Sequence, residues 1–143
     1  MTDYLVLAEA YGSVLADEQV PCVIVQFHGF ANSEQFKHIM DTGLAYYQAH
    51  SQPARPWGWV GDTRTMSAIP KDVQTWLTTD WNLRAYAAGI REISIVVSQN
   101  VMGQMATQHY ATKTAAEQVT YEIEPAYYDS LETAKQGAAR RLA

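Results

Sequence analysis

Two adjacent stretches decide the fold of this chain: VPCVIVQFHG at residues 20–29 and NSEQFKHIMDTGLAYY at residues 32–47. The first is a short apolar run rich in Val, which favours a buried strand. In the second, Asn32 can cap a helix with Gln35 as its reciprocal partner. The apolar residues that follow recur at helical spacing: Phe36, Ile39, Met40, Leu44 and Tyr47. Together the two stretches predict a strand followed by a helix that packs one apolar stripe on a sheet.

Upstream of this strand, residues 4–16 mix β-forming residues with Ala, and the polar turn Asp17–Gln19 follows them. We interpret residues 4–16 as the first arm of an antiparallel hairpin, in which Gly12 marks a bulge. A helical turn over Leu5–Ala10 is the alternative.

Downstream, strand and helix patterns alternate. We expect strands over Trp57–Asp62, Ile90–Val97 and Val119–Glu124, of which the first carries two Trp on one face and the second is central. We expect helices between Pro70 and Gly89, around residues 101–110, and from Ser130 onward. The buried face of the first of these helices is expected to carry Val73, Leu77, Trp81, Leu83 or Arg84, and Ala88, and that of the second Val101, Met102, Met105 and Tyr110. Within the second helix, Asp80 and Arg84 are spaced to pair on the surface.

Such alternation implies right-handed crossovers between parallel strands. We therefore predict a single α/β domain over residues 1–143. Its mostly parallel sheet has about five strands, with an antiparallel N-terminal edge strand and about four helices.

The composition restricts the partner and the compartment. With 48% apolar residues, 17% charged residues and a formal charge of −5, the chain can bury one core and offers no basic surface for a nucleic acid. The single Cys22 lies inside the apolar strand and is expected in the core. The basic doublet Arg140-Arg141 suits a helix C-terminus. No apolar run approaches the roughly 18 residues of a membrane span, so we expect a cytoplasmic protein.

Four segments, in this order and spacing, resemble the SpoIIAA-like superfamily: Phe27-His28-Gly29, Gly61-Asp62-Thr63-Arg64, the segment Asp80–Ala85 followed by Ala88-Gly89, and Tyr127–Ala134. This group contains the STAS domains of anti-sigma-factor antagonists and is related to the Sec14-like (CRAL-TRIO) lipid-binding domains. The chain looks similar to the small stand-alone bacterial members. It departs from them at Gly137, where the group usually carries a larger apolar residue, and this predicts weaker packing of the last helix.

The resemblance implies a non-enzymatic regulatory or protein-interaction module with a protein partner. Binding of a small apolar or lipid-like ligand between sheet and helices, as in the Sec14-like relatives, is the alternative, and a homodimer is a third. In the antagonists a partner kinase phosphorylates a serine in an Asp-Ser-Ser-Gly-like stretch. This chain lacks that stretch, on which the classical phosphorylation switch depends. Thr63, Thr65 and Ser67 are the positional counterparts of the phosphorylated serine.

The candidate interaction residues are Asp62, Arg64, Trp59, Trp81 and Arg84. Asp62 and Arg64 are expected at the carboxyl end of a strand, where open parallel sheets present ligand-binding groups. The alternative for this pair is a turn aspartate beside a surface arginine, and for the two Trp it is the core.

No catalytic or cofactor motif is present in the sequence. A Gly-rich phosphate loop, a nucleophile elbow and a Cys beside a base are all missing, so we predict no enzymatic activity. The four histidines, His28, His38, His50 and His109, are scattered and lack companion cysteines at zinc spacing. No metal or other cofactor is therefore expected.

Overall fold

The sheet has six strands in the order β1-β2-β3-β4-β5-β6, so strands adjacent in sequence are also adjacent in space. A computed structural model describes residues 3–117 and 121–142. The strands are β1 (Tyr4–Glu9), β2 (Gly12–Asp17), β3 (Cys22–Gly29), β4 (Gly58–Met66), β5 (Glu92–Val96) and β6 (Glu124–Tyr128). The first three pair antiparallel and the last four pair parallel. The predicted α/β class and its mostly parallel sheet are confirmed.

The predicted single arm over residues 4–16 is wrong in one respect, because it consists of two strands, β1 and β2. Gly12 begins β2 and marks no bulge. A Cβ at this position would lie 2.5 Å from the Gln26 carbonyl oxygen, so the close approach of β3 requires glycine here. The irregularity lies in β1 instead, between Leu5 and Leu7. The chain therefore opens with three antiparallel strands.

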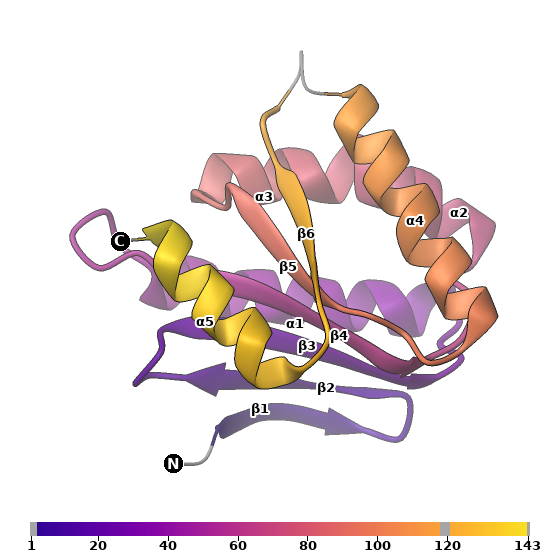
Figure 1. The fold of residues 1–143 in the computed structure, drawn as a ribbon, viewed down its shortest axis with the longest axis horizontal. Coiled ribbons are helices and arrows are strands. Elements are labelled where there is room, and N and C mark those ends of the chain that lie inside the picture. Colours follow the sequence, from indigo (N-terminus) through magenta and orange to yellow (C-terminus); the bar gives the residue numbers. More distant parts are fainter. Residues whose placement is uncertain (1–2, 118–120, 143) are drawn as a thin grey trace.

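Helices cover the two faces of the sheet unequally (Figure 1). The helices are α1 (Ser33–His50), α2 (Lys71–Trp76), the π-helical turn η1 (Leu77–Trp81), α3 (Asn82–Ala88), α4 (Val101–Ala116) and α5 (Leu131–Leu142). The crossovers between parallel strands place α1 to α4 on one face, because each crossover has the same hand and the strands progress in one direction. Among the helices of the described residues, only α5 packs on the other face, against β4, β5 and β6. We call this second side the α5 face.

The predicted helix signals are confirmed where they act locally. Asn32 and Gln35 form a reciprocal capping box at the start of α1. Gly89 ends α3 with φ at 112°, a left-handed conformation that favours glycine. Asp80 and Arg84 form the expected ion pair at 3.0 Å. The sequence therefore fixes the ends of these helices through contacts only a few residues apart.

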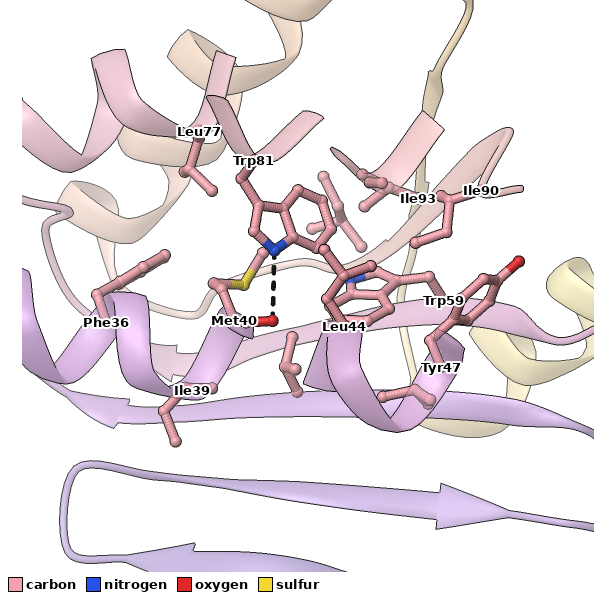
Figure 2. Close-up of a cluster of buried hydrophobic side chains, with 14 of the residues drawn as sticks. Phe36, Ile39, Met40, Leu44, Tyr47, Trp59, Leu77, Trp81, Ile90 and Ile93 are labelled. Atoms are coloured by element: carbon pink, nitrogen blue, oxygen red, sulfur yellow. Dashed lines mark hydrogen bonds between the residues drawn. The ribbon is translucent and has the colours of Figure 1, made fainter. Parts of the chain in front are cut away.

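The core lies between the sheet and the helices α1 to α4. The rings of Trp59 and Trp81 have centroids 5.0 Å apart, and both side chains are fully buried (Figure 2). The Trp81 indole donates a hydrogen bond to the Met40 carbonyl oxygen at 3.3 Å, which links η1 to α1. On the α5 face, a smaller cluster contains Cys22, Ile24, Val60, Val96 and Ala134.

Two predictions for the last third of the chain need correction. The predicted strand Val119–Glu124 is displaced: residues 118–120 lie outside the described residues, and the strand is β6, which begins at Glu124. Tyr121 and Ile123 are buried before the strand begins, so their alternation reflects burial and not strand pairing. The expected buried face of α4 is confirmed at Tyr110 and is wrong at Val101, Met102 and Met105, which are more than half exposed.

The last helix is packed tightly at the position where weak packing is expected from the family pattern. A Cβ on Gly137 would collide with the ring and hydroxyl of Tyr128, so the tyrosine from β6 fills the space that a side chain at residue 137 would take. Lys135 in the same helix bonds Asp3 at 2.6 Å and Asp17 at 3.0 Å, and it is only 15% exposed. Helix α5 is thus held at both the parallel and the antiparallel part of the sheet.

A buried polar network holds α4 against α3. Asn82 is fully buried, and its amide donates to the Thr114 hydroxyl at 3.1 Å and to the Tyr121 hydroxyl at 3.0 Å. The Tyr110 hydroxyl donates to the Asn82 carbonyl oxygen at 2.8 Å, and the Tyr121 hydroxyl donates to the Thr78 carbonyl at 2.9 Å. The side-chain oxygen and the side-chain nitrogen of Asn82 are both hydrogen-bonded. The network therefore orients α3, α4 and the segment at Tyr121 relative to one another without leaving a polar group of Asn82 unpaired.

Replacing Asn82 by leucine should lower the free energy of unfolding by about 2–4 kcal/mol, because buried hydroxyls lose their partners. Urea unfolding followed by tryptophan fluorescence measures this. The control is Leu83→Ala at the neighbouring position, which is 42% exposed and should change stability by less than about 0.5 kcal/mol. A loss below about 1 kcal/mol for Asn82→Leu would show that the network is not a source of stability.

Cys22 should react with thiol reagents only when the protein unfolds. The side chain has no exposed surface, and burial raises the pKa of its thiol to about 12, so little thiolate forms at neutral pH. Labelling with a disulfide reagent at pH 8 should accelerate with urea in parallel with global unfolding. Fast labelling in the absence of urea would contradict the placement of Cys22 in the core.

Candidate functional site

A small polar groove opens on the α5 face at the carboxyl ends of β3 and β4. It has a volume of about 260 Å³. We define the polar groove by its lining residues Gln26, Phe27, His28, Asp62, Arg64, Thr65 and Gln99. Along β4, Val60 lies in the apolar cluster under α5, and Asp62 and Arg64 follow toward the carboxyl end. The face therefore changes from apolar to polar where the groove begins.

A bulge in β4 brings the charged end of the strand into the polar groove. Gln26 pairs with Asp62, but His28 pairs with Thr65, so β4 has one residue more than β3 between these pairs. An extra residue re-aims the side chains beyond it, and both Arg64 and Thr65 consequently line the groove. The strand does not end at Asp62, as the sequence predicts, but continues to Met66.

Asp62 and Arg64 form a bidentate ion pair. The Arg64 Nε donates to Asp62 Oδ1 at 2.9 Å, and Nη2 donates to Oδ2 at 2.7 Å. Oδ2 also accepts from the Gln26 amide at 2.9 Å, and Oδ1 from the Arg64 backbone N–H at 3.2 Å. The carboxylate side chain is 5% exposed and the arginine side chain 39%. The acid thus lies at the bottom of the polar groove, and the base reaches its mouth.

The hydrogen bonds of the pair decide its charge state. Burial by itself works against the charged form of Asp62, but hydrogen bonds from Arg64 and Gln26 hold the pKa of this carboxyl below its usual range. The hydrogen bond to Asp62 raises the pKa of Arg64. Both groups are therefore charged at neutral pH.

The mouth of the polar groove carries hydrogen-bond donors. The two contacts to Asp62 use Nε and Nη2 of Arg64, and among the described residues no acceptor contacts Nη1. The amide of Gln26 has a second hydrogen that its bond to Asp62 leaves free. His28 is exposed and contacts the Ser13 hydroxyl at 3.4 Å. This arrangement suits an acceptor group, such as an oxyanion, more than a cation.

The structure does not bring the other candidate residues to this groove. Trp59 and Trp81 are fully buried in the core. Arg84 lies on the helix side of the molecule, where it pairs with Asp41 and Asp80 at 3.0 Å and sits 5.6 Å from the Trp76 ring centre. Arg84 therefore does not converge with Asp62 and Arg64 on a common cleft.

The three hydroxyl residues considered as phosphorylation sites differ in access. The Thr63 hydroxyl is buried and donates to the Val96 carbonyl at 2.6 Å. Thr65 is exposed, and its hydroxyl donates to the Phe27 carbonyl at 3.0 Å. Ser67 is half-buried in the loop before α2. A kinase could reach Thr65 and Ser67 more easily than Thr63.

Exposed apolar side chains lie at the same edge of the sheet. We define the apolar rim as Phe30, Val101, Met102 and Met105, which are 58%, 67%, 54% and 58% exposed. The rim adjoins the polar groove because the Gln99 N–H donates to the Arg64 carbonyl at 3.0 Å just before α4 begins. The Ser67 N–H likewise donates to the Gly29 carbonyl at 3.0 Å, beside Phe30. Sequence periodicity missed the rim because it assigned these α4 residues to the core.

Two other hollows lie elsewhere in the described part of the chain. The space between the sheet and the helical elements α1, η1 and α4 is about 50 Å³, well below the roughly 300–1,000 Å³ of small-molecule sites. A wider cleft of about 710 Å³ lies near the amino ends of β4 and β5, and it is lined by apolar residues together with Arg91, Glu92, Ser94 and Glu124. Glu122, which also lines it, follows residues 118–120, which are outside the described residues.

Comparison of the chain with models of protein families, with curated proteins and with solved structures found no match. Within the described residues, no group of three or more His, Cys, Asp or Glu side chains is placed to hold a metal ion. In the same part of the chain, no helix is long and apolar enough to cross a membrane. The polar groove and the apolar rim are therefore defined by the geometry of this structure alone.

The Asp62 carboxylate should make the stability of the protein depend on pH below about pH 4. Its pKa is lower in the folded state than in the unfolded chain, so its contribution is present above the unfolded value near 3.9 and is lost as the pH falls through the folded value. The pH dependence of unfolding between pH 5 and pH 2 should be weaker in Asp62→Asn than in the wild type.

Urea titrations at several pH values test this dependence. Asp129→Asn, at an exposed position, is the control and should retain the wild-type pH profile. Equal pH profiles for wild type and Asp62→Asn would show that the ion pair does not stabilise the fold.

Proposed function

We propose that this chain is a non-enzymatic regulatory or protein-interaction module that binds a partner protein through the polar groove and the adjoining apolar rim. The observation that carries the proposal is the set of four exposed apolar side chains beside a fixed, part-exposed arginine at one edge of the sheet. Phenylalanine, methionine and arginine are enriched in protein interfaces relative to other surfaces. Isolated exposed apolar residues need no explanation, but four of them in segments that begin at the same edge of the sheet do.

The position of this surface on the fold supports the same function. The carboxyl ends of parallel strands are where open α/β sheets present binding groups. The resemblance to the SpoIIAA-like superfamily, stated as a hypothesis from the sequence, implies a partner protein for such a domain. The inference from the fold is an analogy, and the exposed residues give it a physical basis.

The alternative of an apolar ligand between sheet and helices has less support. The side chains around Trp59 and Trp81 leave about 50 Å³ in the middle of this layer. The wider cleft of about 710 Å³ at the amino ends of β4 and β5 is lined in part by Arg91, Glu92, Ser94, Glu122 and Glu124, which suit a lipid chain poorly. Self-association through the apolar rim is the second form of protein interaction that this surface allows.

A photo-crosslinking amino acid at Met102 tests the proposal in cells. We expect a discrete adduct with one protein, because the side chain is 54% exposed within the apolar rim. The same amino acid at Gln136, exposed on α5, is the control and should not give that adduct. An adduct of twice the chain mass would assign the surface to self-association. Identical adduct patterns at both positions would overturn the proposal.

When the crosslinking amino acid is placed at Phe30 instead, the double variant Met102→Ser, Met105→Ser should give less of the adduct with the partner protein. The two substitutions should not unfold the protein. Both side chains are more than half exposed, so their loss should change the free energy of unfolding by no more than about 0.5 kcal/mol. Unchanged crosslinking in the double variant would show that α4 does not contribute to binding.

A further inference from the structure

We infer that the polar groove binds a single oxyanion, a carboxylate or a phosphoryl group, presented by an acidic segment of the partner protein. The inference rests on the proposed function for the source of the group. The groove itself, however, can be tested without the partner.

The buried acid and the part-exposed base give the polar groove its polarity. Asp62 is almost completely covered, and its oxygens already accept four hydrogen bonds. Its charge is thus satisfied inside the protein. Among the residues that line the groove, no other acid faces the mouth. An incoming oxyanion therefore meets Arg64 and neutral donors, and not a second negative charge.

The fork of Arg64 is held in one orientation before any ligand binds. Two of its nitrogens are fixed on Asp62, so its remaining edge is presented without the loss of side-chain freedom that a mobile arginine would undergo. Charge-assisted hydrogen bonds of this kind are roughly twice as strong as neutral ones. The Gln26 amide and the His28 imidazole can add donors from β3 on the other side of the groove.

Arg84 is a second ion-paired arginine of this chain, and its surroundings can be compared with those of Arg64. Its side chain is 41% exposed, nearly the same as Arg64, but its two partner carboxylates on Asp41 and Asp80 are 48% and 52% exposed. Two exposed acids around one base make the local charge negative, which repels an anion. The two arginines are thus matched in exposure but differ in local charge, because one carboxylate neutralises Arg64 and two carboxylates surround Arg84.

Nuclear magnetic resonance with simple anions tests the groove. Phosphate and acetate are titrated at constant ionic strength, with chloride as the screening control, and the Arg64 Nε–H and the Gln26 and Gln99 side-chain amides are followed. We expect saturable shifts of these signals with a Kd on the order of 1–10 mM, as a few part-exposed charged hydrogen bonds would give. Saturation with phosphate alone would assign a phosphoryl group, and saturation with both anions a general oxyanion.

Two variants identify the binding residue. Arg64→Gln should weaken phosphate binding at least about tenfold, since a charged donor is lost. Because Arg64→Gln leaves Asp62 without its ionic partner, Arg64→Lys is the second variant: it keeps the charge and the fold but loses the fixed fork, and should weaken binding severalfold. The matched control Arg84→Gln should leave the titration unchanged.

The inference is overturned if the shifts grow linearly with anion concentration or if chloride causes equal shifts. It is also overturned if Arg84→Gln abolishes the shifts and Arg64→Gln does not. Such a result would leave the proposed function standing if crosslinking at Met102 still gives a specific adduct. Conversely, specific anion binding without an adduct would support the groove and contradict the protein partner.

Discussion

The contact between Trp59 and Trp81 sets the distance between the sheet and its main helix layer. Trp59 comes from β4 and Trp81 from η1, and the Trp81 indole also bonds the backbone of α1 through Met40 (Figure 2). Helix α1 can approach this closely because residue 43 is glycine, where a Cβ would lie 2.8 Å from the Trp59 ring. The rings leave about 50 Å³ in the middle of this layer, and the proposed binding surface lies outside it.

The π-helical turn is what directs Trp81 into the core. The buried residues of α2, η1 and α3 include Val73, Leu77, Trp81 and Ala85, each four positions after the last. In a regular α-helix a stripe of this spacing drifts by ~40° at each step, because four residues exceed one turn of 3.6. The wider turn at Leu77–Trp81 offsets this drift. An α-helical period therefore leads to Leu83 or Arg84, which is why the sequence could not settle the buried face.

The sequence predicted well the features that depend on near neighbours. The capping box at Asn32 and the glycine stop at Gly89 act within a few residues of themselves. Features that depend on contacts across the fold were missed. Gly12 faces a carbonyl of β3, and the bulge in β4 exists only relative to its partner strand. Asp62 and Arg64 were thus identified as a pair, whereas the groove around them required the register of two strands.

Under the proposed function, the Asp62–Arg64 pair presents a charged donor at the edge of the sheet. Removing a carboxylate from water is costly, and an apolar pair of similar size is often as stable as a buried ion pair. The neighbouring positions Val60 and Val96 show that this face accepts apolar residues where α5 covers it. The charged pair begins where the helix no longer covers the sheet, and the bulge turns it toward the opening. An ion pair that fixes a guanidinium at an uncovered edge is the arrangement expected of a preorganised binding group.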